Sequence, residues 1–234
     1  MTTPPYDADV PPPRLASRPC CPGGARVFLE PPDVEESIAY RVNGHRPEAT
    51  GEVDDTPPAV TTAWHEAAHA VFGHGFGMRI DSIRIRQPAM VKFSHGNNLA
   101  APMRIAVDFA GAIGVMSRIR CWSTISVDDE DDYLARIEAG LGGGCDECGM
   151  ARWAWLSVGL SAGRSAAREV FRAGQRLALT IGQRRDVQSA IRALAAALME
   201  HHTMTGAEAH AVIENYINFG ELAHAEEDQK AARG

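Results

Sequence analysis

The sequence predicts a mainly α-helical domain with a small β ribbon and a flexible, proline-rich N-terminal arm. Of the 14 prolines, 12 lie in residues 1–58, where they oppose regular structure. Beyond them, apolar residues recur mostly at helical spacing, and only residues 78–93 alternate as strands do. The chain has 234 residues, of which 45% are hydrophobic and 23% charged, so we expect one ordinary globular domain.

The domain boundaries follow from the same distribution of proline. Residues 1–56 are predicted to be a flexible arm, because proline fixes φ and removes a backbone donor. After Pro57 and Pro58, the residues up to 225 hold only two more prolines, Pro88 and Pro102, so the compact domain is placed over residues 57–225. Residues 226–234 are predicted to be a disordered tail.

The first elements of the domain are a helix and a ribbon. Residues 55–58, Asp-Thr-Pro-Pro, form a helix-start signal, and the helix is predicted to run through Phe72 into the glycine-rich residues 73–77. Residues 78–86 then alternate in polarity, and residues 91–93 are expected to pair with them.

The rest of the domain is predicted to be helical. Residues 101–120 form a buried helix rich in small and apolar residues, and a helix over 132–141 follows an acidic run. Two long helices are expected around the apolar positions of 170–181 and 187–198, and a shorter one over 206–216.

Charge and composition exclude several classes of protein. A net charge of -7 and a pI near 5.7 argue against a general nucleic-acid binder. Apolar runs such as Ile105–Met116 are too short to span a bilayer, and the start lacks the features of a secretion signal. The five cysteines are an odd number. We therefore expect a reduced, cytoplasmic protein without a membrane or nucleic-acid partner, able to form an oligomer.

The chemistry is concentrated in an HExxH motif inside the first helix. His65 and His69 are four residues apart, so both imidazoles lie on one helix face and can bind the same tetrahedral zinc ion. Glu66 is rotated by about 100° from His65 and is positioned for a metal-activated water rather than for the metal. This pattern predicts one catalytic Zn²⁺ and a peptidase in which Glu66 is the general base. The fold class is thus a zincin-type helical peptidase domain.

A third zinc ligand must come from elsewhere in the chain. A metzincin needs a glycine and a histidine three and six residues beyond the second histidine, where this chain has Phe72 and Gly75. That class is excluded. The acidic run 128–132 is the favoured source of the ligand, since helix capping alone hardly explains five acids. His74 is an alternative that is better explained as a loop or supporting histidine.

The zinc-binding segment, Ala63 to Val71, resembles the zinc helix of the FtsH-like metallopeptidases. The ribbon at 82–86, the apolar-Ala-Gly helix at 105–114 and the acidic helix start follow in the same order as in that family. The resemblance covers about residues 58–216. It implies a third ligand at the start of the acidic helix, which corresponds best to Asp132, with Asp131 as the alternative.

The chain also departs from the family pattern. Ala68 replaces a glycine of the motif, and Met116-Ser-Arg118 stands where the family has Gly-Arg-Ala-Ala-Glu. No GxxxxGK[ST] phosphate loop occurs in the sequence. The resemblance therefore implies a peptidase domain that acts on a protein or peptide substrate without ATP hydrolysis by this chain.

Two other functions remain open at this point. One is an ImmA-like regulatory peptidase, and the other is a non-catalytic metal-binding or scaffold protein, which the presence of Glu66 disfavours. Cys145 and Cys148 form one CxxC, which would need further ligands to hold a second, structural zinc. Arginines at 164, 168, 172 and 176 form a basic stripe that is best explained as a solvated helix face.

Overall fold

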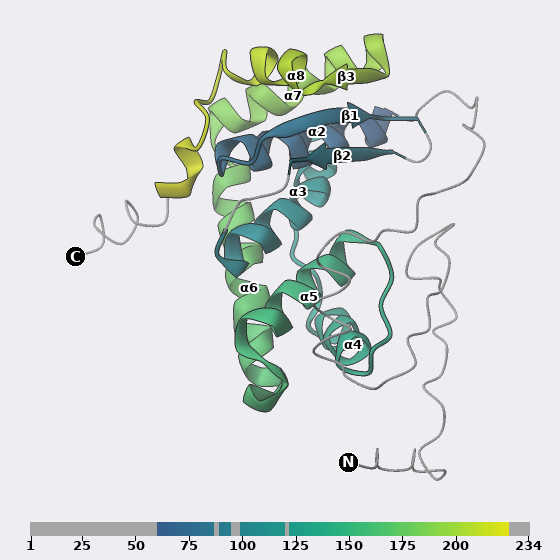
Figure 1. Ribbon diagram of the computed structural model, residues 1–234, viewed down its shortest axis with the longest axis vertical. Coiled ribbons are helices and arrows are strands. Elements are labelled where there is room, and N and C mark those ends of the chain that lie inside the picture. The colour runs from purple at the N-terminus through teal and green to yellow at the C-terminus, as the bar shows by residue number, and fades with distance from the viewer. Residues whose placement is uncertain (1–59, 87–88, 95–98, 120–121, 225–234) are drawn as a thin grey trace.

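The computed structural model describes residues 60–86, 89–94, 99–119 and 122–224 (Figure 1). The predicted arm over 1–56 and the predicted tail over 226–234 lie outside these residues. The described part is mainly helical, with one small antiparallel sheet, as the sequence predicts. Its helices are α2 (Val60–Gly75), α3 (Ala101–Ile119), α4 (Val127–Glu138), α5 (Asp146–Val158), α6 (Gly163–Gly182), α7 (Arg185–His201) and α8 (Gly206–Ile213), and its strands are β1 (Ile80–Arg84), β2 (Met90–Phe93) and β3 (Thr203–Thr205).

The sheet has the order β2-β1-β3, with both neighbours antiparallel to β1. The pairing of β1 with β2 confirms the predicted ribbon. The strand β3 was not predicted, because three residues between two helices carry almost no periodic signal. Its Met204 pairs with Ile83 of β1, so the segment before α8 completes the sheet.

Helix α3 lies at the centre of the fold. It packs against α2, α5 and α6, while α7 covers another side of α2. In Figure 1, α2, the sheet and α8 form the upper part of the molecule, and α4, α5 and the lower half of α6 form the other part. The buried core is continuous through both, and its largest fully buried side chains include Phe72, Ile105, Ile113, Trp155 and Phe171.

The α2 helix continues to Gly75 rather than ending near Phe72. Gly73 and Gly75 are expected from the sequence to end the helix, but in the structure they allow neighbouring side chains to pack closely against its last turn. A Cβ atom on Gly73 would lie 2.3 Å from Cε1 of Phe93, and one on Gly75 would lie 2.3 Å from Cδ1 of Leu222. Tertiary contacts thus stabilise a glycine-containing last turn that local propensity disfavours.

Two further helices differ from the prediction. Helix α4 begins at Val127, five residues before the expected start, because the Ser126 side chain accepts the backbone N–H of Asp129 and caps it. Helix α5 was not predicted at all, and it follows directly after the glycines at 142–144. Both differences bear on the third ligand.

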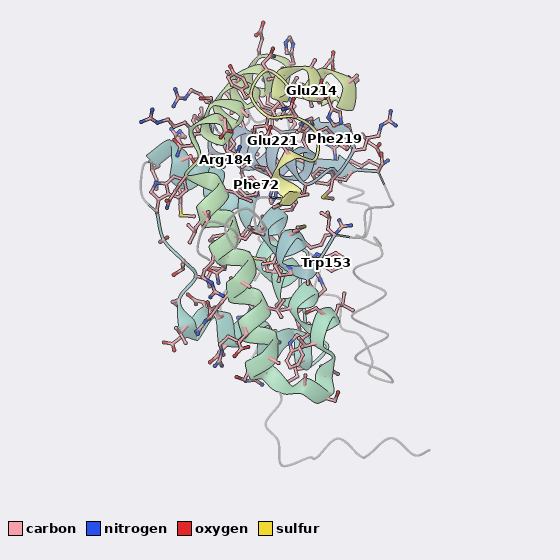
Figure 2. The ribbon with its side chains drawn as sticks, turned by 90° about the vertical axis from the view of Figure 1, so that its left-hand side faces the viewer. Phe72, Trp153, Arg184, Glu214, Phe219 and Glu221 are labelled. Atoms are coloured by element: carbon pink, nitrogen blue, oxygen red, sulfur yellow. The ribbon has the colours of Figure 1, made fainter. Side chains whose placement is uncertain are left out.

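The α6–α7 corner is joined to the C-terminal segment by ion pairs. The Arg184 guanidinium donates to Asp186 at 2.6 Å and to Glu221 at 2.8 Å. Figure 2 shows Arg184 and Glu221 in the part of the molecule that also holds Phe72. None of the described helices combines the length and apolarity needed to cross a membrane.

Candidate metal centre

The α2 helix presents His65 and His69 on one face, one turn apart. Their Nε2 atoms are 3.0 Å apart. The Nδ1 atom of His69 donates a hydrogen bond to the carbonyl oxygen of Val107, at 2.7 Å. This bond fixes the ring and directs its Nε2 atom toward His65 and Asp146. A backbone carbonyl commonly orients a metal-binding imidazole in this way.

The third group beside these imidazoles is the carboxylate of Asp146. Its Oδ2 atom lies 3.0 Å from Nε2 of His65 and 3.2 Å from Nε2 of His69. The three atoms thus form a nearly equilateral triangle. In a tetrahedral zinc site with bonds of about 2.0–2.1 Å, ligand atoms are roughly 3.3 Å apart. Two imidazoles and one carboxylate are ordinary zinc ligands, so residues and spacing both fit the ion.

Helix α5 positions this carboxylate. Asp146 is its first residue, after Cys145 at the N-cap. The helix is anchored by its buried face, and the indole Nε1 of Trp155 donates to the carbonyl oxygen of Leu134 in α4, at 3.0 Å. Asp146 is therefore presented at the end of a well-packed helix that contacts α3.

The structure does not bring Asp132 or Asp131 to the two histidines. Because α4 begins at Val127, both lie in its second turn rather than at its start. Asp132 pairs with Arg136 on the same helix, and Asp131 pairs with Arg168 of α6. The carboxylate beside His65 and His69 is therefore that of Asp146, and neither expected aspartate lies there.

The acidic run and the basic stripe instead bind each other. Glu130 accepts hydrogen bonds from Nε of Arg172 at 2.7 Å and from Nε2 of Gln175 at 2.9 Å, and Arg164 pairs with Glu138. Glu130, Asp131 and Glu138 of α4 are thus accounted for by their pairing with α6. The stripe is not simply a solvated face.

Close approach of α3 to α2 shapes the site. A Cβ atom on Gly111 would lie 2.2 Å from Cε1 of His65, and one on Gly114 would lie 2.2 Å from the carbonyl oxygen of Trp64. The two glycines let α3 lie directly against the helix that bears the motif. The other motif residue, Glu66, is 7% exposed.

The electrostatics couple the three groups. Burial lowers the pKa of His69, but the charge and hydrogen bond of Asp146 outweigh it and raise that pKa to about 9. Burial opposes ionisation of Asp146, yet His69 and His65 bring its pKa well below the ordinary value. A divalent cation can take the place of the protons between Asp146 and the imidazoles, so that all three groups bind it.

Another carboxyl group lies close to the centre. Asp108 follows Val107 on α3, and burial is the main cause that raises its pKa to about 7. The negative charge of Asp146 adds to this effect, while His69, Arg152 and Arg104 oppose it. No motif or spacing in the sequence marks Asp108 as part of this centre.

A second histidine cluster joins the end of α2 to α8. His74 is fully buried, and its Nδ1 lies 2.7 Å from Nδ1 of His210; a carboxylate oxygen of Glu214 is also within 4.8 Å. Figure 2 shows Glu214 and Phe219 at this end of the molecule, away from Trp153 of α5. His74 is thus neither a loop residue nor part of the group formed by His65 and His69.

Hydrogen bonds argue against a metal in this second cluster. Nε2 of His74 donates to the carbonyl oxygen of Ile217, so its Nδ1 is an acceptor. The backbone N–H of Ile80 donates to Nε2 of His210, so Nδ1 of that ring carries the hydrogen and donates to His74. All four ring nitrogens are used in one consistent arrangement. It joins α2, β1 and α8 as a neutral imidazole pair.

The CxxC motif gains a different interpretation from its position. Cys145 and Cys148 lie on either side of Asp146 at the start of α5, and Cys148 accepts the backbone N–H of Gly143. The groups of possible metal ligands among the described residues contain no cysteine. Asp146 lies inside this CxxC, so a possible metal motif in the sequence did coincide with the position of the third group.

Comparison of the chain with protein-family models, with characterised proteins and with solved structures gives no match.

Proposed function

We propose that this protein is a zinc-dependent peptidase of the zincin type, in which His65, His69 and Asp146 hold the ion and Glu66 is the general base. One observation carries the proposal: three ligand atoms, two of them from an HExxH helix, lie within 3.0–3.2 Å of one another. The substrate would be a protein or peptide, cleaved without ATP hydrolysis by this chain.

Zinc bound at these residues would polarise a peptide carbonyl and make water a stronger nucleophile near neutral pH. The protein groups have separate roles. Val107 holds the His69 ring in the orientation for binding, and the Asp146 carboxylate offsets the charge of the ion. Glu66 would take a proton from the attacking water and deliver it to the leaving amine.

A purely structural role is less consistent with this arrangement. Structural zinc sites usually use four protein ligands, whereas the group around His65 offers three among the described residues. Three protein ligands leave a fourth coordination position on zinc for water or substrate. Glu66 directly follows the first ligand and is 7% exposed, which is the position that a general base of such a peptidase occupies. An ImmA-like regulatory peptidase remains the alternative with the same chemistry and a different substrate.

The decisive experiment measures zinc content and cleavage of casein in parallel. We expect about one zinc per chain in the wild type and in Glu66→Gln, and cleavage lowered by about 10²–10⁴-fold in Glu66→Gln alone. Glu169→Gln, which changes an exposed glutamate on α6, is the matched control and should retain full activity. Joint replacement of His65 and His69 by alanine should abolish zinc binding.

Two results would contradict the proposal. Equal cleavage by the wild type and Glu66→Gln would show that Glu66 is not the general base. A fully zinc-loaded wild type that cleaves neither casein nor a mixed peptide library would instead favour a metal-binding scaffold.

A further inference from the structure

A pocket of about 350 Å³ opens beside the candidate metal centre, and both His65 and Asp146 line it. Its size is at the lower end of the range of ligand pockets. The walls are mainly apolar and come from α3, α5 and the segment between α3 and α4, through Phe109, Ala112, Val115, Met116, Ile125 and Met150. Such walls suit an aliphatic chain.

The pocket also has an acidic part. Asp108 and Glu147 line it together with Asp146, and none of the described residues that line it is a lysine or an arginine. If Asp146 binds the metal, two carboxyl groups remain for a ligand. A positive charge on the ligand would therefore complement the acidic part of the lining.

Asp108 has the more unusual environment of the two. Helix α5 lies directly against its carboxyl group, since a Cβ atom on Gly149 would be 2.4 Å from Oδ2. Within the described part of the chain, this carboxyl accepts no hydrogen bond and forms no ion pair. The charges of Arg104 and Arg152 act on this carboxyl group, although Arg104 lies over the ring of Trp153 and Arg152 donates to the carbonyl oxygen of Gly143.

We propose that this pocket binds the basic side chain of a lysine or arginine residue next to the scissile peptide bond, with Asp108 pairing with the charged end. This inference rests on the proposed peptidase function and specifies its substrates. Lysine and arginine combine a long methylene stem with a cationic end, which matches apolar walls leading to a carboxylate.

The same geometry explains why other side chains would bind less well. An apolar side chain would fill the walls but leave Asp108 desolvated and without a partner. An acidic side chain would add a like charge beside Asp108 and Glu147. Unpaired polar groups in a binding site are a strong source of discrimination between substrates.

The test uses fluorogenic peptides that differ at one residue on either side of the cleaved bond: lysine, arginine, norleucine or glutamate. We expect kcat/KM for the lysine peptide to exceed that for the norleucine peptide by about tenfold or more, and that for the glutamate peptide by a larger factor. In Asp108→Asn the ratio of lysine to norleucine should fall to about one. The matched control Asp132→Asn, whose acid pairs with Arg136, should keep the wild-type ratio.

A wild-type preference for norleucine or glutamate would overturn the inference without needing any variant to fold. An unchanged lysine preference in a folded Asp108→Asn would overturn the role of Asp108.

A binding measurement separates failure of this inference from failure of the proposed function. Fluorescence anisotropy of the lysine and norleucine peptides on zinc-loaded Glu66→Gln reports the pocket without cleavage, and the lysine peptide should bind more tightly by a similar factor. Cleavage without lysine preference would contradict only the pocket assignment. Tighter lysine binding by a wild type that never cleaves would support the pocket and contradict the peptidase.

Discussion

A Cβ atom on Gly111 would lie 2.2 Å from Cε1 of His65 and 2.6 Å from both of its ring nitrogens. The α3 helix therefore touches a candidate metal ligand through a residue that has no side chain. A side chain at this position would have to displace the ring, and changes in the residues that orient a metal ligand typically weaken metal binding by about 10–100-fold.

Replacing Gly111 with alanine should displace the His65 ring and lower zinc affinity by at least about tenfold. Competition with a chromophoric chelator measures this effect. Gly174→Ala is the control, because its Cβ would meet Ile105 at 2.2 Å and strain the α3–α6 packing instead. That variant should lose thermal stability yet bind zinc normally when folded. Equal zinc affinity in both variants would contradict the role given to Gly111.

The assignment of the third ligand predicts opposite results for two aspartates. Asp146→Ala should weaken zinc binding by more than about 100-fold, beyond the effect of losing a supporting contact. Asp132→Ala removes only an exposed pair with Arg136 and should leave zinc affinity unchanged. Isothermal titration with zinc under a competing chelator distinguishes the two. Loss of zinc binding in Asp132→Ala but not in Asp146→Ala would show that the third ligand is Asp132 of α4.

The contact between α4 and α6 should depend on one buried acid. Glu130 is 3% exposed and accepts hydrogen bonds from Arg172 and Gln175. Glu130→Ala should lower the free energy of unfolding by about 2 kcal/mol, less than for a fully buried pair because Arg172 remains partly exposed. Glu138→Ala, which breaks the exposed pair with Arg164, should cost below about 0.5 kcal/mol. Urea unfolding measures both, and equal losses would refute the distinction.

Acid should destabilise the protein through the pair of His74 and His210. Burial is the first cause that lowers both pKa values below 6.5; the neighbouring imidazole of His210 adds to it for His74, and Arg79 adds to it for His210. Glu214 opposes the effect on both rings. As the pH falls below about 6.5, the two histidines bind protons in the unfolded chain but not in the folded protein. The free energy of unfolding therefore decreases.

Thermal unfolding between pH 7.5 and pH 5.5, with EDTA present throughout, measures this dependence. His210→Gln should be less stable than the wild type at pH 7.5 and should lose less stability on acidification. The site formed by His65, His69 and Asp146 contributes to the pH dependence of both proteins alike, so the difference between them isolates the second cluster. Parallel pH profiles would contradict this explanation.

The sequence by itself determined the elements with long periodic patterns. The α2 helix, the β1–β2 ribbon, α3, α6 and α7 follow from the spacing of apolar residues, because that spacing reports which face of an element is buried. It also placed His65, Glu66 and His69 on one helix, since their separation is local and fixed by the helical turn.

Tertiary structure alone decided which carboxylate meets those histidines. Asp146 is 77 residues from His69, and no local pattern relates two positions so distant in sequence. Two acids of the acidic run, Glu130 and Asp131, pair with arginines of α6. A single aspartate at the start of an unpredicted helix reaches the two imidazoles instead. The packing of α5 against α3 sets the position of Asp146, and this packing exists only in the folded chain.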